Sequence, residues 1–206
     1  MTALQEVGDF DKLLLESRTQ DAQVGNALTK KVSVSEARDR HAFAMLQDEW
    51  DALVCSTTNE PFYKHAFIRV WLDNFAPQAN LRVLVGRDHA GKLVAALPLV
   101  EERARMYGIR VRRLTGASND HSPRFDLIAE DREAAGSAFM EYLHRSGDWD
   151  VLLLRDVPPE GNGCGLSEAA RAIGYKTGTW DSLLSPYIPL PSPVEELERS
   201  LETKFK

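Results

Sequence analysis

The chain has few cysteines, no excess of positive charge and no long apolar segment, and each absence excludes a class of protein. Cys55 and Cys164 are the only cysteines among 206 residues, so they cannot form the disulfide framework of a small secreted domain. Asp and Glu (31) outnumber Lys and Arg (25), and the formal net charge is -6, whereas nucleic-acid binders are usually basic. The longest apolar run, Leu93 to Val100, is far shorter than the roughly 20 residues of a membrane-spanning helix. We therefore expect a cytoplasmic protein with no nucleic-acid partner and no membrane span.

The composition fits one folded domain with extra chain at each end. Residues 1–27 are polar and offer little that a core could bury, so we expect a loose N-terminal extension. We expect residues 28–191 to fold as one domain around one core. Residues 192–195 read Ser-Pro-Val-Glu, a capping box that predicts a helix over 192–206. No glycine or asparagine ends this helix, so we expect it to pack poorly in this chain, and the alternative is a terminal helix docked on the core.

Hydrophobic periodicity predicts the order of strands and helices. Alternation predicts strands at 31–35, 81–85, 92–100 and 109–114, and helical spacing predicts helices at 43–54, 67–75, 132–145 and 166–173. Residues 151–154 are apolar throughout, which predicts a strand covered on both faces, and 177–190 predict two more short strands. Pro98 cannot donate to a ladder, so we expect a bulge or an edge position there. This order predicts an α/β (α+β) fold with a mixed, mostly antiparallel sheet and helices on both faces.

Three patterns that often carry chemistry have structural interpretations here. The glycine-rich segment 161–165 lacks the third glycine of a dinucleotide loop, because Leu166 stands there, so we expect a flexible connection. The five histidines stand far apart and neither cysteine has a ligand nearby, so we expect no metal site. The aromatic stripes of the first two helices predict core packing, with Trp50, Trp71 and Leu153 buried together.

A basic cluster lies in the predicted hairpin of the last two meander strands. It consists of Arg103, Arg105, Arg110, Arg112 and Arg113. In an acidic chain, such a cluster could meet a phosphate-bearing ligand, an acidic surface or RNA. Arginines alternating with Ile109 and Val111 are equally typical of a solvated sheet face. The sequence leaves both interpretations open.

The densest polar stretch, residues 116–126, connects the meander to the third predicted helix. It places His121 between the carboxylates of Asp120 and Asp126, which can orient the imidazole for general-base catalysis. Arg124 in this stretch, together with Arg155, could hold an anionic substrate. An ordinary surface loop carries the same kinds of residue, and that alternative also stays open.

Seven short stretches follow one another along residues 32–206. They are Asp-Glu-Trp-Asp-Ala-Leu at 48–53, Pro-Phe at 61–62, Leu-Arg-Val-Leu-Val at 81–85, Leu-Val-Ala-Ala-Leu-Pro-Leu at 93–99, Leu-Thr-Gly at 114–116, Trp-Asp-Val-Leu-Leu-Leu-Arg-Asp at 149–156 and Pro-Tyr-Ile-Pro-Leu at 186–190. In this succession the chain resembles the CelD/BcsL-type acetyltransferases, which are associated with cellulose biosynthesis. The resemblance implies a GNAT-like fold.

The resemblance also implies a function. We expect an acyl-CoA-dependent N-acyltransferase that transfers acetyl or another acyl group to a small amine or sugar-type acceptor, in envelope polysaccharide or lipid metabolism. The family has two GNAT-like halves, of which this chain matches the first, and the helix over 192–206 would lead into the second. Acetyl-CoA or another acyl-CoA would be the co-substrate, bound mainly by the second half, so this chain alone is expected to be inactive. The alternative is a non-catalytic GNAT-like domain that shapes the substrate cleft of a catalytic partner half.

The resemblance adds candidate cofactor residues to those found in the polar stretch. GNAT enzymes hold the CoA pyrophosphate with a Q/R-x-x-G-x-G/A loop that opens a helix. Arg113 and Gly116 match this loop, and Ser118 replaces its last small residue. The candidate site is thus Asp120, His121 and Asp126 for catalysis, Arg124 and Arg155 for the substrate, and Arg113 and Gly116 for the cofactor.

Overall fold

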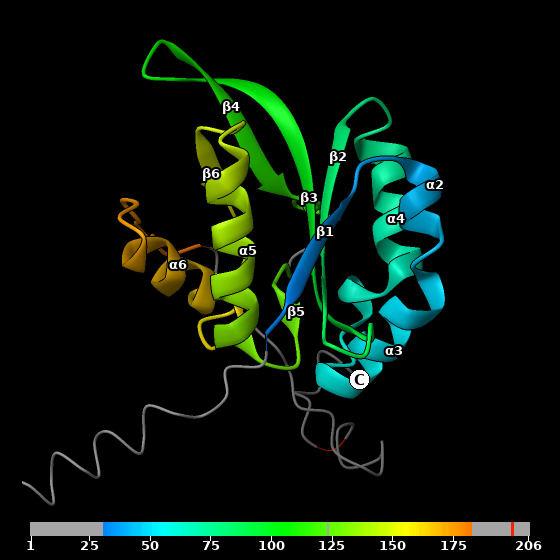
Figure 1. Ribbon diagram of the computed structural model, residues 1–206. Coiled ribbons are helices and arrows are strands. Elements are labelled where there is room, and N and C mark those ends of the chain that lie inside the picture. Colours follow the sequence, from blue (N-terminus) through cyan, green and yellow to red (C-terminus); the bar gives the residue numbers. More distant parts are fainter. Residues whose placement is uncertain (1–30, 123, 183–198, 200–206) are drawn as a thin grey trace, which may run out of the picture.

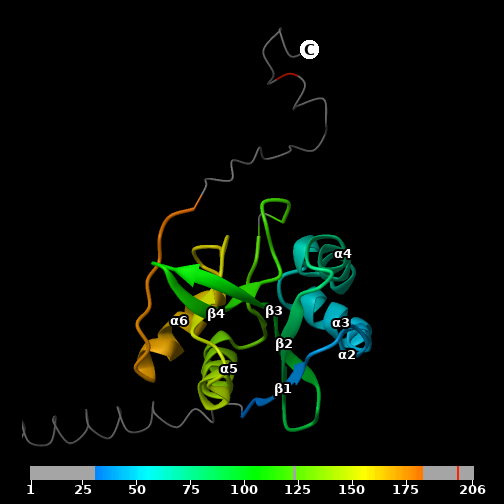
Figure 2. The same ribbon diagram turned by 90° about the horizontal axis from the view of Figure 1, so that it is seen from above.

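The computed structural model describes residues 31–122, 124–182 and 199 (Figure 1). The elements are β1 (Ser33–Ala37), α2 (Arg40–Ala44), α3 (Gln47–Thr57), the 3-10 turn η1 (Pro61–Tyr63), α4 (His65–Phe75), β2 (Asn80–Arg87), β3 (Leu93–Met106), β4 (Ile109–Gly116), β5 (Ile128–Ala129), α5 (Arg132–Ser146), β6 (Val151–Leu153) and α6 (Gly163–Ala172). A six-stranded, mostly antiparallel sheet carries α2 to α4 on one face and α5 with α6 on the other (Figure 2). The predicted fold class is confirmed.

The sheet order is β1-β2-β3-β4-β6, with β5 paired to β3 beside this path. The three-stranded meander is confirmed, and β4 pairs with β6 in parallel. Pro98 lies neither at a bulge nor at the sheet edge, contrary to expectation. On one side β3 pairs with β5 at Ala95–Ala96 and with β4 from Leu99 onward, and Pro98 lies at this change of partner. The Pro98 carbonyl accepts the Ala117 backbone N–H at 2.9 Å, on the side of β3 where the partner strand changes. The regular hydrogen bonding between strands is already interrupted there, so the N–H that proline lacks is not needed.

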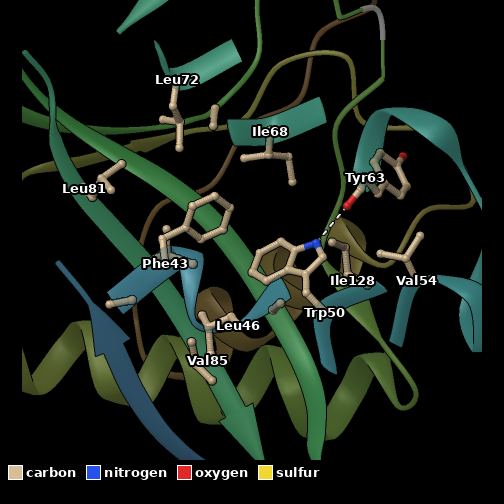
Figure 3. Packing of buried hydrophobic residues seen from close by; sticks show 14 of the residues in the cluster. Phe43, Leu46, Trp50, Val54, Tyr63, Ile68, Leu72, Leu81, Val85 and Ile128 are labelled. Atoms are coloured by element: carbon tan, nitrogen blue, oxygen red, sulfur yellow. Dashed lines mark hydrogen bonds between the residues drawn. The ribbon is translucent and has the colours of Figure 1, made fainter. Parts of the chain in front are cut away.

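The core between the sheet and α2 to α4 is built around Trp50 (Figure 3). The Trp50 indole is fully buried and donates to the Tyr63 carbonyl at 2.8 Å, which satisfies its polar group. Phe43 packs edge-on against Trp50 and stacks on the buried His65, whose Nε2 lies 2.9 Å from the Phe43 carbonyl. The stripe of the first predicted helix is therefore core, as predicted, whereas in the second stripe Trp71 is buried and Phe75 is 51% exposed. The single helix expected at 43–54 is two helices, interrupted at Met45 and Leu46.

The core on the other face packs α5 and α6 over residues such as Leu97 and Leu114. The two helices meet at glycines, because a Cβ on Gly136 would lie 2.7 Å from the backbone of Gly165. This close approach explains the glycine-rich segment: Gly163 to Gly165 open α6 and are not a flexible connection. Gly174 ends α6 in the left-handed region, at φ 91°, as its position predicts.

Five other expectations are corrected or stay untested. Residues 151–153 are only half-buried, so β6 is not covered on both faces. Trp50 and Trp71 are buried, but Leu153 is not buried with them. Residues 177–182 form no strand. Residues 183–190 and the expected extension at 1–27 lie outside the described residues. So does the expected helix over 192–206, except for Arg199.

Sequence reasoning did not single out Arg82, which is 1% exposed in the middle of β2. Its guanidinium contacts the carboxylates of Glu36, Asp148 and, at 3.5 Å, Glu101. The Tyr142 hydroxyl donates to Glu36 at 3.2 Å and joins β1 to α5 through the same network. Removing one member of such a buried network leaves an unpaired charge, so it holds β1, β2 and the end of α5 together.

Candidate functional site

A cleft of about 700 Å³ lies between α4 and the ends of β4 and β6. Trp71 and Phe75 of α4 form one side, Thr115 and Leu153 belong to the sheet, and Trp180 completes the apolar lining. Its volume is in the roughly 300–1,000 Å³ range of small-molecule sites, which are mostly apolar with a few polar groups. The cleft is therefore large enough for a small ligand.

The cleft exists because the described helices on this face cover only part of the sheet. The core beneath α2 to α4 uses residues of β2 and β3, such as Val83 and Val100, and contains none from β4 or β6. Strand alternation turns Leu114 toward α5 and α6, and its neighbours Arg113 and Thr115 toward the cleft. The same strands thus build a core on one face and a cleft on the other.

The cleft also lies at the carboxyl end of the one parallel strand pair in the described sheet. β4 and β6 pair in the register Arg113↔Val151 to Thr115↔Leu153, and the chain leaves them at Gly116 and Leu154. In open sheets with parallel strands, ligands bind outside the carboxyl ends of these strands. The position of this cleft agrees with that rule.

The charged groups of the cleft are arginines with different partners. Arg113 Nε donates to Glu102 at 2.7 Å, a strong ion pair within the hairpin base. Arg155 lies 3.5 Å from Asp120, and both side chains are more than half exposed. Such an exposed, long ion pair contributes little to stability, so the Arg155 guanidinium is available to an anionic ligand group. The Trp71 Nε1–H is buried without an acceptor among the described residues.

The structure brings five of the predicted site residues to this cleft. Arg113, Gly116 and Arg155 line it, and Asp120 contacts Arg155. The exposed His121 ring stacks on Phe75, with centroids 5.2 Å apart and planes 20° apart. Phe75 lines the cleft, so His121 lies at its rim. Sequence reasoning missed the aromatic side of the cleft because Trp71 and Phe75 were assigned to core packing.

Asp126 and Arg124 have other roles. Asp126 is 5% exposed, and its carboxylate accepts backbone N–H groups of Asn162 at 2.8 Å and Gly163 at 2.6 Å. It therefore caps the start of α6 from 36 residues away, and burial raises the pKa of this carboxyl. Arg124 pairs with Glu60 at 3.1 Å. No hydrogen bond joins the His121 ring to Asp126 among the described contacts, so the expected flanking of His121 by two oriented carboxylates is not formed.

The segment from β4 to α5 does not fit a CoA pyrophosphate. The Asp131 carboxylate already accepts the Glu133 and Ala134 amides at the start of α5, at 3.1 and 3.0 Å. Residues 117–131 separate this helix from β4, and the Ala117 and Ser118 amides donate within the protein. A Cβ on Gly116 would lie 2.7 Å from the Phe125 ring. The packing of Phe125 is therefore sufficient to explain a glycine at this position. We therefore derive no chemical step through CoA bound to this segment.

The described residues contain no group of three or more His, Cys, Asp or Glu side chains that could hold a metal ion. Within them, every helix is too short or too polar to cross a membrane.

Comparison with known proteins gives likeness of fold at low sequence identity. No family model and no curated protein matches the chain. A ribosomal-protein-alanine N-acetyltransferase from Brucella melitensis biovar Abortus aligns over 76% of this chain and 99% of its own, with 14% identity and a TM-score of 0.46. An aminoglycoside 6'-N-acetyltransferase from Acinetobacter baumannii aligns over 77% and 99%, with 11% identity and a TM-score of 0.43. A GNAT family acetyltransferase from Staphylococcus aureus aligns over 76% and 99%, with 8% identity and a TM-score of 0.41. Likeness at this level does not define family membership.

Proposed function

We propose that this domain serves acyl transfer from acyl-CoA to an amine or sugar-type acceptor, and that it supplies the acceptor cleft. The proposal rests on one contrast. The cleft is open to a ligand, whereas backbone N–H groups at the starts of two helices already donate to carboxylates of the protein. The cleft offers aromatic surfaces and the weakly paired Arg155. The starts of α5 and α6 are filled by Asp131 and Asp126. In this proposal acyl-CoA is held by a second GNAT-like half, as the family resemblance implies.

In this proposal each group of the cleft has a task. Trp71, Phe75 and Trp180 provide apolar faces against which a sugar ring or an alkyl chain can pack. The Arg155 guanidinium orients an anionic substituent of the acceptor. His121, exposed at the rim and held by its stacking on Phe75, accepts the proton that the acceptor amine loses. A ligand anion can replace Asp120 in its long, exposed ion pair with Arg155.

A second candidate function is a non-catalytic domain that shapes the cleft of a partner half. It is favoured by the burial of Asp126 and by the absence of a hydrogen-bonded partner for the His121 ring among the described residues. The two candidates differ at one residue, because only the first requires His121 to move a proton.

The test is acyl-transfer kinetics of the protein together with the second half, following release of the CoA thiol with a panel of amines and amino sugars. We expect Arg155→Ala to raise KM for the acceptor about tenfold with little change in kcat. Arg124→Ala is the matched control, because Arg124 pairs with Glu60 outside the cleft lining. An unchanged KM in Arg155→Ala, or an equal effect in the control, would contradict the acceptor cleft.

A further inference from the structure

We propose that the tip of the β3–β4 hairpin docks on an anionic phospholipid surface, with residues 106–109 in the interface and arginines among the headgroups. The hairpin extends past α5 and the rest of the sheet (Figure 1). Tyr107 at its turn is fully exposed, and Ile109 and Met106 beside it are 69% and 38% exposed. This inference is independent of the acceptor cleft.

The register of the hairpin places like charges opposite one another. Arg103 pairs with Arg112 across the strands, and Arg105 pairs with Arg110. Alternation puts these four guanidinium groups on one face of the hairpin, where directly opposed like charges destabilise a sheet. The arrangement therefore needs a compensating negative charge.

The described residues supply that charge to one of the four. Arg112 Nη2 pairs with Asp150 at 2.9 Å. No described carboxylate pairs with Arg103, Arg105 or Arg110. On the same face Glu101 and Asp148 are directed to the buried Arg82 instead. In a chain of net charge -6, three arginines on one hairpin face without a carboxylate partner among the described residues form a site for an external anionic surface.

The distribution along the hairpin favours a lipid surface over other polyanions. The four tip residues carry no charge, and the arginine pairs lie one and three residues behind them, at about 3 Å per residue. The hairpin thus has apolar residues at its tip and arginines behind them. This order matches a bilayer interface, where acyl chains lie below anionic headgroups. RNA would use the arginine face and leave Met106 and Ile109 exposed to water.

The turn supports an external role for Tyr107. Tyr107 and Gly108 have φ values of 50° and 84°, the left-handed pair of a two-residue hairpin turn. Asparagine or glycine suits the first of these positions better than an aromatic residue does. The Tyr107 ring contacts nothing that would offset this cost, since it is fully exposed. Tyrosine is enriched at membrane–water interfaces, where its ring meets apolar and polar surroundings together.

Sedimentation of the full chain with vesicles tests the proposal. We expect binding to phosphatidylcholine vesicles that contain about one third phosphatidylglycerol, and loss of binding at high salt or without the anionic lipid. The triple variant Arg103→Gln, Arg105→Gln, Arg110→Gln should lower the partition coefficient about 100-fold, at roughly fivefold for each arginine. The matched control is Arg69→Gln, Arg132→Gln, Arg145→Gln, which removes three exposed arginines from helices and should change binding less than about threefold.

A second variant separates docking from folding. Tyr107→Asn should leave the melting temperature unchanged or higher, because asparagine adopts positive φ more readily, while vesicle binding falls about tenfold. Three results would overturn the proposal: no binding to anionic vesicles, equal loss in both triple variants, or binding of polyuridine or an acidic protein through these arginines without vesicle binding.

Discussion

The two faces of the sheet at β4 and β6 are made by alternate residues of the same strands, yet one is a core and the other a cleft. Leu114 is fully buried beneath α5 and α6, whereas its neighbour Thr115 lines the cleft beside α4. Beneath α6, the buried Asp126 carboxylate accepts the backbone N–H groups of Asn162 and Gly163. On the cleft face Arg155 is held only by a long, exposed ion pair. The comparison shows that helix cover decides which face remains available to a ligand.

The largest expected effect is on the stability of the core face. Leu114→Ala should lower the free energy of unfolding by about 2–5 kcal/mol, because a fully buried leucine leaves a cavity. Leu153→Ala, on the cleft face of the adjoining strand, should cost less than about 1.5 kcal/mol, because Leu153 is half-buried. Urea denaturation of both variants measures the difference. Equal losses would mean that the cleft face is packed as a core.

The next effect is on catalysis. If the domain serves acyl transfer as proposed, His121→Ala should lower the acyl-transfer rate about 100-fold, as removal of a general base does. The free energy of unfolding should change by less than about 0.5 kcal/mol, since His121 is exposed and only stacks on Phe75. Phe75→Leu is the companion variant, because it removes the stacking and keeps the histidine. Retained activity in His121→Ala would favour the non-catalytic domain.

Asp126 provides a smaller effect with a defined pH dependence. Asp126→Asn should cost about 1–3 kcal/mol at neutral pH, because an amide has only one acceptor oxygen for the backbone donors at Leu127, Asn162 and Gly163. Burial raises the pKa of Asp126 above that of an unfolded aspartate. The folded state therefore holds the proton more tightly, and its contribution is present at low pH and lost as pH rises through the folded pKa.

The wild type should accordingly gain stability relative to Asp126→Asn as the pH falls from neutral toward the ordinary aspartate range. Chemical denaturation of both proteins at several pH values measures this difference. A difference that stays constant with pH would contradict the burial of an ionisable Asp126.

The smallest effect concerns Asp150 at the base of the hairpin. Hydrogen bonds from the Arg112 side chain and backbone lower the pKa of Asp150 to about 2. Its contribution to stability is present above the unfolded aspartate pKa and lost as the pH falls from about 4 to about 2. The acid unfolding curve of Asp150→Asn should lack this step. Because the pair is exposed, about 1 M salt should weaken the wild-type step.

Much of the fold was predictable from periodicity, because amphipathic stripes and alternation depend on local sequence. The helix α5 and the strands β2 and β4 lie within about two residues of their predicted bounds, whereas β3 extends to Met106, past its predicted end at Val100. Which helices pack over a strand does not depend on local sequence alone. The apolar run at 151–154 is the same whether helices lie over one face of the strand or both. The sequence therefore predicts deeper burial of β6 than the structure shows.

The site was predictable in part for the same reason. Arg113, Gly116 and His121 lie close to one another in sequence, and the loop keeps them near one cleft. Asp126 could not be assigned, because its partner Gly163 is 37 residues away and no local signal marks a cap of another helix. Arg82 did carry a signal, since an arginine amid apolar strand residues predicts buried carboxylate partners.

Isothermal titration of the chain with CoA and acetyl-CoA tests most directly the claim that this domain forms an acceptor cleft without a CoA site. The carboxylates of Asp131 and Asp126 occupy the backbone donors at the starts of α5 and α6 that a pyrophosphate would need. We therefore expect no saturable heat at concentrations up to about 1 mM, where a weak site of about −4 kcal/mol would begin to fill. Micromolar binding that Arg113→Ala abolishes would contradict the account.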